Sequence, residues 1–205
     1  MAVKVAGVIL AGGQSTRMGG GDKSLRELGG RPLLDHVIER LRPQADGLLL
    51  NANGDASRFS TWDIPVVSDT IADVGPLGGI HAGLSWAARQ PQGYSHILTV
   101  AADTPFFPET LAQLLITAEA GTGTIVLASS DGRVHPTFGL WPITLRRDLE
   151  AFLSRTGSAS VKAFAEREHG AIVVDFPLSG EFDPFFNVNT PEDLAAARNF
   201  MRTDR

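Results

Sequence analysis

Short apolar runs alternate with stretches of helical periodicity over the first part of the chain. The apolar residues from Val3 to Leu10 predict a buried strand that ends at Ala11. Similar runs predict strands at residues 48–50, 64–67, 96–101 and 124–128. Apolar positions at helical spacing predict a helix between Pro32 and Pro43, one from residue 75 towards residue 89, and one at 108–119.

After Ser130 this alternation is less regular. Residues 133–140 predict an extended segment that crosses the site, and residues 171–174 predict an edge strand. Helical stretches are expected at 143–153, 160–168 and 191–201. Buried strands that alternate with amphipathic helices predict an α/β fold with a mainly parallel sheet. We expect residues 1–205 to form a single domain, because the chain shows no repeat or linker.

Composition narrows the classes of function. The chain has 205 residues, of which 43% are hydrophobic, enough for one sizeable core. Its net charge of -5 argues against general binding to nucleic acid or to anionic membranes, since both need a positive field. It has no cysteine and no apolar stretch that approaches 18 residues, which predicts a protein of the reducing cytoplasm.

The first predicted strand runs into a glycine-rich, basic loop, VILAGGQSTRMGGGDK, at residues 8–23. Glycines such as Gly12 and Gly13 let the backbone approach a ligand closely, and Arg17 and Lys23 add positive charge. A flexible surface loop is the alternative, but this combination favours phosphate binding. Asp22 stands where a Walker A loop needs glycine, and the dinucleotide-binding glycine spacing is also missing.

Polar residues follow several of the predicted strands. Asn51, Asp69 and Asp103 each come at or after a strand end, so a parallel sheet would gather them at one edge with the glycine-rich loop. Asp103 follows a buried run and could hold a hard cation beside phosphates, or it could cap the helix that comes next. Gly78 and Gly79 cost a helix roughly 1 kcal/mol each relative to alanine, which indicates that another group approaches closely there.

The pattern L-A-G-G-x-S-x-R-M-G-G-x-D-K resembles the signature of transferases that move a nucleoside monophosphate from a nucleoside triphosphate. Further motifs follow it in order across nearly the whole chain: NAN at 51–53, GPLGG at 75–79, ADTP at 102–105, HPT at 135–137 and FNVNTPEDL at 186–194. Together they resemble the molybdenum cofactor guanylyltransferase family. The resemblance implies a three-layer Rossmann-like sandwich, and transfer of GMP from GTP to molybdenum-loaded molybdopterin with release of pyrophosphate.

The resemblance also implies roles for individual residues. The nucleotide-binding residues would be Leu10, Ala11, Gly12, Gly13, Lys23, Asn51, Asp69 and Asp103. Catalysis would rest on Lys23, Arg17 and Asp103, with Asp103 as a ligand of Mg²⁺. His135, Asn187 and Asn189 would face the pterin. Related sugar-nucleotide transferases have Asp-x-Asp where this chain has Asn187-Val188-Asn189, and amides are weaker ligands of hard cations, so a second protein ligand for Mg²⁺ is not implied.

The implied reaction is direct displacement at the α-phosphorus of GTP by a pterin phosphate oxygen, which is already ionised and needs no general base. Gly12 favours GTP, because cytidylyltransferase relatives usually carry alanine there and its methyl group would take space from a purine. The open alternatives are a molybdopterin cytidylyltransferase or another sugar- or alditol-phosphate nucleotidyltransferase, and a non-catalytic nucleotide or cofactor carrier. Molybdoenzymes or their chaperones are expected to receive the product.

Overall fold

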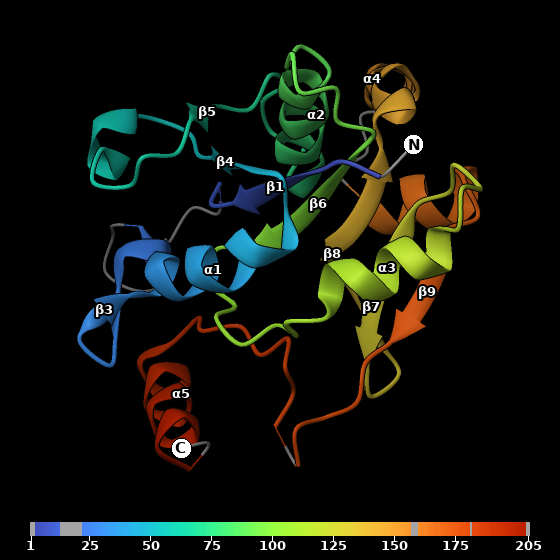
Figure 1. The fold of residues 1–205 in the computed structure, drawn as a ribbon. Coiled ribbons are helices and arrows are strands. Elements are labelled where there is room, and N and C mark those ends of the chain that lie inside the picture. The colour runs from blue at the N-terminus through green and yellow to red at the C-terminus, as the bar shows by residue number, and fades with distance from the viewer. Residues whose placement is uncertain (1–2, 13–21, 157–159, 181, 204–205) are drawn as a thin grey trace.

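The structure, a computed structural model, describes residues 3–12, 22–156, 160–180 and 182–203. Its centre is a seven-stranded sheet with the order β5-β4-β1-β6-β8-β7-β9 (Figure 1). All neighbouring strands pair in parallel except β8, which is antiparallel to β6 and β7. The strands are β1 (Val5–Leu10), β4 (Gly47–Asn51), β5 (Val66–Val67), β6 (His96–Ala101), β7 (Val126–Ser130), β8 (Arg133–Pro142) and β9 (Ile172–Asp175).

The predicted helices are present with small shifts of their ends. They are α1 (Leu33–Leu41), α2 (Pro76–Ala87), α3 (Leu111–Glu119), α4 (Arg146–Thr156) and α5 (Pro191–Thr203). Short 3₁₀ turns lie at Lys23–Leu25, Arg42–Gln44, Ala56–Phe59 and Ile143–Leu145, and Ala163–Glu168 forms a π-helical turn. No helix in the described part of the chain is long and apolar enough to cross a membrane.

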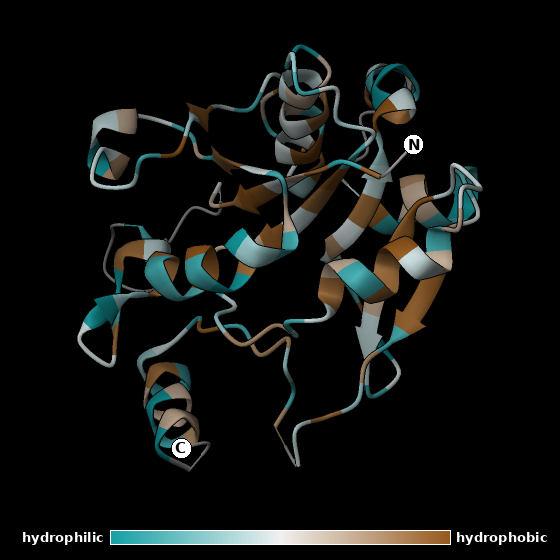
Figure 2. Cartoon of the chain, viewed as in Figure 1, coloured by the Kyte–Doolittle hydropathy of each residue, from teal (hydrophilic) through white to brown (hydrophobic). Residues whose placement is uncertain are grey.

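Side chains of the sheet alternate between two apolar layers, as the two-residue period of a strand requires. In β1, Val5 and Ile9 pack with α1 and α3, whereas Ala6 and Val8 pack with α2 and α4. Figure 1 shows these two pairs of helices on opposite faces of the sheet, and Figure 2 shows apolar residues concentrated on the strands between them. The expected three-layer α/β sandwich is confirmed.

The second half of the sheet differs from the expectation of an extended segment that only crosses the site. Residues 133–140 belong to β8, a full strand inserted between β6 and β7. The turn before it is Asp131-Gly132, and both residues have positive φ. Such two-residue turns reverse the chain into an antiparallel hairpin, so β8 pairs with β7 directly. The structure also contains a short hairpin, β2 (Glu27–Leu28) and β3 (Arg31–Pro32), that apolar periodicity did not predict.

The chain changes direction at β1. From β1 it runs to β4 on one side and then returns to β6 on the other, so the carboxyl ends of β4, β1 and β6 lie next to one another. A reversal of strand order of this kind leaves a crevice beyond the strand ends, where ligands of α/β proteins bind. The predicted polar residues therefore meet at this edge.

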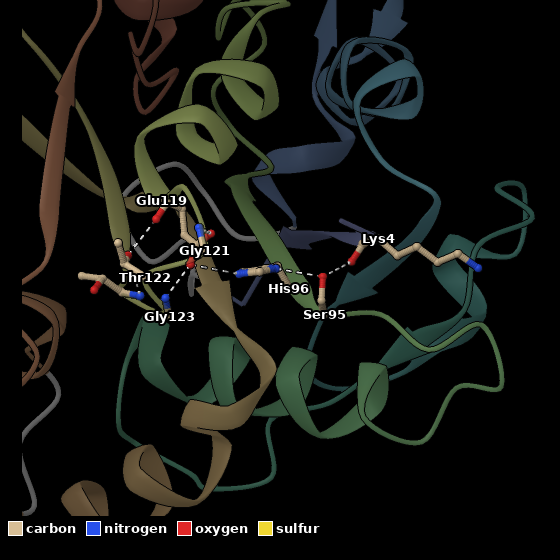
Figure 3. A network of polar contacts seen from close by, with 8 residues as sticks. Lys4, Ser95, His96, Glu119, Gly121, Thr122 and Gly123 are labelled. Carbon is tan, nitrogen blue, oxygen red and sulfur yellow. Dashed lines mark hydrogen bonds and ion pairs between the residues drawn. The ribbon is translucent and has the colours of Figure 1, made fainter. Parts of the chain in front are cut away.

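A second polar network lies at the other end of the strands, near the start of β6 (Figure 3). His96 begins β6, and its Nδ1 lies 2.9 Å from the Ser95 hydroxyl, while its Nε2 lies 3.8 Å from Glu119. The buried Glu119 carboxylate ends α3 and accepts the amides of Gly121 at 2.8 Å and Gly123 at 2.6 Å. Burial acts to raise the pKa of Glu119, but these amides and His96 outweigh it and lower that pKa. The carboxylate thus holds the turn between α3 and β7.

Replacing Glu119 with alanine is expected to lower the free energy of unfolding by about 2 kcal/mol, because hydrogen bonds to a charged group contribute ~1.5–3 kcal/mol and water can partly replace them at exposed amides. Urea unfolding at pH 7 measures this loss. Glu109→Ala is the matched control, since its side chain is 77% exposed and its loss should change stability by less than about 0.5 kcal/mol. Equal effects of the two substitutions would contradict the role given to Glu119.

The same network predicts a pH dependence. The folded pKa of Glu119 lies below its ordinary value of 4.5, so the carboxylate contributes stability that is fully present above about pH 4.5 and is lost as pH falls through the folded pKa. The stability difference between wild type and Glu119→Ala should therefore shrink below pH 4.5. A difference that grew on acidification would have the wrong sign.

Candidate active site

A cleft of about 420 Å³ opens at the carboxyl ends of β4, β1 and β6, within the size range of small-ligand sites. β1 leads into its floor through Leu10, Ala11 and Gly12. The start of α2 lines one wall, and β8 contributes Thr137. The predicted residues that line the cleft are Leu10, Ala11, Gly12, Lys23, Asn51, Asp69, Asp103 and Asn187.

One end of the cleft is a hydrogen-bonded cluster around Asp69. Its two carboxylate oxygens accept the amide groups of Asn51, at 2.9 Å, and Asn53, at 2.8 Å. The Asn53 oxygen in turn accepts the backbone N–H of Asp69 at 2.9 Å. Because each group holds another, the three side chains keep one arrangement and can present fixed polar atoms to a ligand.

Glycine allows the start of α2 to approach this cluster. A Cβ on Gly79 would lie 2.2 Å from Asn51 Oδ1, and one on Gly78 would lie 3.1 Å from Asp69 Cγ. The close approach expected at these glycines is therefore confirmed, and the approaching groups are the side chains of Asn51 and Asp69. Gly12 differs, because a Cβ there would lie at ordinary contact distance, 3.6 Å from Asn53 Nδ2 and 3.7 Å from Asn51 Oδ1.

The other end of the cleft carries a cation and a carboxylate. Lys23 begins the 3₁₀ turn that follows the glycine-rich loop, and its ammonium lies 4.0 Å from Asp103 Oδ2. The same ammonium donates to Asn189 Oδ1 at 2.7 Å. Lys23 is thus held from two sides, with about a quarter of its side chain exposed to the cleft. A fixed cation at such a place suits a phosphate group.

Asp103 lies two residues after the end of β6 and lines the same end of the cleft as Lys23. Burial raises the pKa of Asp103, and Lys23, a backbone N–H and Thr104 oppose that rise. The neighbouring groups therefore do not fully offset the cost of burying this carboxylate, and a cation bound beside it would stabilise its ionised form. The alternative of a helix cap is wrong, because α3 begins at Leu111 with Thr110 as its N-cap.

These groups fit a magnesium ion that is bound mainly by its substrate. Among the described residues, no cluster of three or more histidine, cysteine or acidic side chains could hold a metal. Mg²⁺ is commonly held by one or two carboxylates together with substrate phosphates and water. Asp103 supplies one carboxylate at the phosphate end, and Asn187 lines the cleft beside it with an amide oxygen that accepts the Thr104 hydroxyl.

Some predicted residues are placed differently or not at all. Gly13 and Arg17 lie outside the described residues. Asn189 bonds to the ammonium of Lys23 and is not one of the residues that line the cleft, so its contact with a pterin stays a prediction. The ring of His135 is 8% exposed, bonds to Ser130 and stacks on Phe185, and among the described residues of β8 it is Thr137 of the same motif that lines the cleft. A contact of His135 with a pterin stays a prediction.

The sequence alone assigned no role to four polar residues of the cleft. Asn53 belongs to the NAN motif, and its alternation with Asn51 could have indicated it. Thr137 carried no local signal, because its position depends on the insertion of β8 between β6 and β7. Asp73 and Ser24 also line the cleft, and no pattern in the chain had pointed to them.

Residues 7–171 match the family model described as MobA-like NTP transferase domain, which spans most of the chain. The chain belongs to the MobA-like NTP transferase family. It is 47% identical over 204 residues to the molybdenum cofactor guanylyltransferase of Mesorhizobium japonicum, covering 97% of each chain. As a member of this family, the chain is a nucleotidyltransferase, and the cleft at the carboxyl ends of β4, β1 and β6 is its candidate active site.

Solved structures confirm the fold of this MobA-like transferase. The molybdopterin-guanine dinucleotide biosynthesis protein A of Archaeoglobus fulgidus superposes with a TM-score of 0.75 at 22% identity, covering 97% of this chain and 99% of that one. The 4-diphosphocytidyl-2C-methyl-D-erythritol synthase of Anaerococcus prevotii superposes with a TM-score of 0.72 at 18% identity, covering 98% and 96%. At these identities the likeness extends to the sandwich fold and not to the choice of base or acceptor.

Proposed function

We propose that this chain transfers GMP from GTP to molybdenum-loaded molybdopterin and releases pyrophosphate. One observation carries the proposal: Lys23 and Asp103 share a cleft with the Asn51–Asn53–Asp69 cluster, so one ligand can meet a phosphate site and a hydrogen-bonding site together. The near full-length likeness to a protein named molybdenum cofactor guanylyltransferase supports the choice of base and acceptor. The proposal includes a cytoplasmic location and transfer of the product to molybdoenzymes or their chaperones.

The chain's own groups would act by binding and alignment. The cluster at Asp69 holds the nucleoside end of GTP, and Lys23 holds its phosphates against the floor at residues 10–12. An oxygen of the pterin's terminal phosphate forms a bond to the α-phosphorus, and the bond from that phosphorus to the bridging oxygen of pyrophosphate breaks. The leaving electrons stay on pyrophosphate, whose charge Lys23 offsets. Mg²⁺ held at Asp103 would supply further neutralisation of phosphate charge.

No described residue needs to take a proton in this reaction. A phosphate oxygen is already ionised near neutral pH, so a general base would add little. Rate enhancement would then come from alignment and charge neutralisation.

Pyrophosphate release by purified protein tests the proposal. Mg²⁺ is present throughout, and GTP, CTP, ATP and UTP are each compared with and without molybdenum-loaded molybdopterin. Release with GTP only when the pterin is present supports the reaction, the base and the acceptor. Release with another nucleotide overturns the base assignment. Tight GTP binding without release from any pair points to a non-catalytic carrier.

Replacing Gly12 with alanine is expected to weaken GTP more than CTP. The added methyl group meets Asn51 and Asn53 at ordinary contact distance, so the protein can fold around it while the ligand loses that space. Because a purine is larger than a pyrimidine, we expect a loss of about tenfold in kcat/KM for GTP, which corresponds to 1.4 kcal/mol, and a smaller loss for CTP. Equal losses for the two nucleotides would remove the steric argument.

A further inference from the structure

A segment near the carboxyl terminus, which we call the strap (residues 182–190), brings Asn187 to the cleft and Asn189 to the ammonium of Lys23. It runs between β9 and α5 and passes below the carboxyl edge of the sheet in the view of Figure 1. Asn187 accepts the Thr104 hydroxyl, and Asn189 accepts the ammonium of Lys23. The strap has no helix or strand of its own, so side-chain and backbone contacts from other elements must keep it in place.

The middle of the strap is hydrogen-bonded to the segment that follows β6 and carries Asp103. The backbone N–H of Val188 donates to the Asp103 carbonyl at 2.8 Å, and the Val188 side chain is fully buried. On its far side, Asp193 of α5 accepts the backbone N–H groups of Asn189 at 2.9 Å and Thr190 at 2.8 Å. These bonds fix the position of Asn189 along the strap.

The near end of the strap is held by a buried relay from the β7–β8 hairpin. Asp183 Oδ1 accepts the Ser130 hydroxyl at 2.7 Å, and the same Ser130 oxygen lies 2.7 Å from His135 Nε2. A hydroxyl has one proton and a carboxylate only accepts, so Ser130 donates to Asp183 and receives a hydrogen bond from His135. Nε2 of His135 therefore carries a proton. Ser130 is fully buried and His135 is 8% exposed, so water cannot readily replace the bond between them, whereas the Asp183 side chain is one-third exposed.

The ring of His135 holds the strap in a second way. It stacks on Phe185 with the ring centroids 4.5 Å apart, and Phe185 is 2% exposed. Phe185 also meets Phe138 and Phe176 with the edges of the rings, at 4.9 and 5.5 Å. The relay and the stack together fix Asp183 and Phe185, which lie a few residues before Asn187 and Asn189.

We propose that the His135–Ser130–Asp183 relay positions the strap, so that His135 is a positioning residue for Asn187, Asn189 and, through Asn189, the ammonium of Lys23. This inference rests on the proposed function for its kinetic consequences. It gives a role to the buried histidine of the HPT motif, which contacts Ser130, Phe185 and Asp183. The relay thus connects a hairpin of the central sheet to Lys23, which lies 166 positions before Asn189 in the sequence.

Three substitutions separate the parts of the relay. His135→Phe removes the Nε2 donor but keeps a ring to stack on Phe185, whereas His135→Gln keeps a donor near the position of Nε2 and loses the ring. Ser130→Ala removes the link itself. Ser129→Ala is the matched control, because Ser129 is buried on the same strand and its hydroxyl donates to Asp175 of β9, away from the strap.

His135→Phe and Ser130→Ala are each expected to lower kcat by about tenfold to a hundredfold, because misplaced catalytic groups lose rate without losing all substrate binding. The rise in the Kd for GTP should be smaller than the fall in kcat, since the side chains of the Asp69 cluster bond to one another, whereas the strap meets the nucleotide site at Lys23. The double variant should be no slower than the slower single variant, because both remove one device. His135→Gln should recover most of the rate, and Ser129→Ala should resemble wild type.

The opposite pattern would overturn the inference. If Ser130→Ala kept full kcat while both His135 variants lost it equally, His135 would contact a substrate directly. Unchanged kcat in all variants would show that the strap does not need the relay. Additive losses in the double variant would show that the two residues act separately.

Amide hydrogen exchange without any substrate tests the same inference independently of the reaction. Peptides that cover residues 182–190 should exchange faster in His135→Phe and Ser130→Ala than in wild type or Ser129→Ala, while peptides of β4 keep their exchange rates. Unchanged exchange in the strap overturns the inference. If the wild-type protein released no pyrophosphate but the variants changed the exchange of the strap as expected, only the proposed function would be overturned.

Discussion

Replacing Lys23 with alanine is expected to lower kcat for pyrophosphate release by about a hundredfold to a thousandfold, the loss that follows removal of one preorganised charge-stabilising group from an active site. The reason lies in the position of the ammonium. It lies 4.0 Å from Asp103 and 2.7 Å from Asn189, at the end of the cleft that suits phosphates. Charge on the leaving pyrophosphate grows as the reaction proceeds, so the loss should fall mainly on kcat.

The same substitution should change stability much less than activity. The pair between Lys23 and Asp103 is about a quarter exposed at both side chains, and partly solvated ion pairs contribute on the order of 1 kcal/mol or less. Thermal unfolding of Lys23→Ala beside wild type measures this. Lys4→Ala is the control, because Lys4 lies at the other end of the strands and its ammonium bonds to the Gln92 carbonyl. If Lys23→Ala kept full activity, the phosphate assignment of this end of the cleft would be wrong.

Replacing Asp103 with asparagine is expected to lower kcat by about a hundredfold or more and to raise the Mg²⁺ concentration that gives the half-maximal rate. An amide is a weaker ligand of a hard cation than a carboxylate, and the described residues offer no cluster of acidic groups that could replace it. Titration of the rate with Mg²⁺ measures both effects. Asp73→Asn, a second acidic side chain of the cleft wall, is the control and should keep its Mg²⁺ dependence.

Asp103→Asn should not destabilise the protein, and the sign follows from the pKa. Burial raises the folded pKa of Asp103 above its ordinary value of 3.8, so the ionised carboxylate is less favourable in the folded protein than in the unfolded chain at neutral pH. A neutral amide removes that cost. We expect a melting temperature equal to or above that of wild type, together with the loss of activity. A marked fall in melting temperature would show that Asp103 serves the fold.

Much of the site could be predicted from local pattern because the geometry of a parallel sheet is generic. Asn51, Asp69 and Asp103 stand at or after strand ends, and the carboxyl ends of parallel neighbours always share one edge. The glycines at 78 and 79 signalled a close approach for a similar reason, since helices rarely keep glycine without cause. These inferences need only the strand period and the chemistry of the residues.

The second half of the chain was less accessible to this reasoning. The Asp131-Gly132 turn is a local signal of a hairpin, yet the place of β8 between β6 and β7 depends on pairing with β6, some forty residues earlier. Thr137 reaches the cleft through that placement. The contacts of His135 depend on Ser130 and on Asp183, which follows it by almost fifty residues.

The sequence by itself determined the fold class, the edge of the sheet that carries the site, and the family, because the strand period, the helix period and an ordered set of motifs are properties of short segments. Only the tertiary structure decided which atoms meet. Lys23 and Asn189 lie 166 positions apart in sequence, and their contact at 2.7 Å exists because Val188 of the strap is buried against β2, α1 and α5. Long-range pairs of this kind depend on how whole elements pack, and no local pattern encodes that packing.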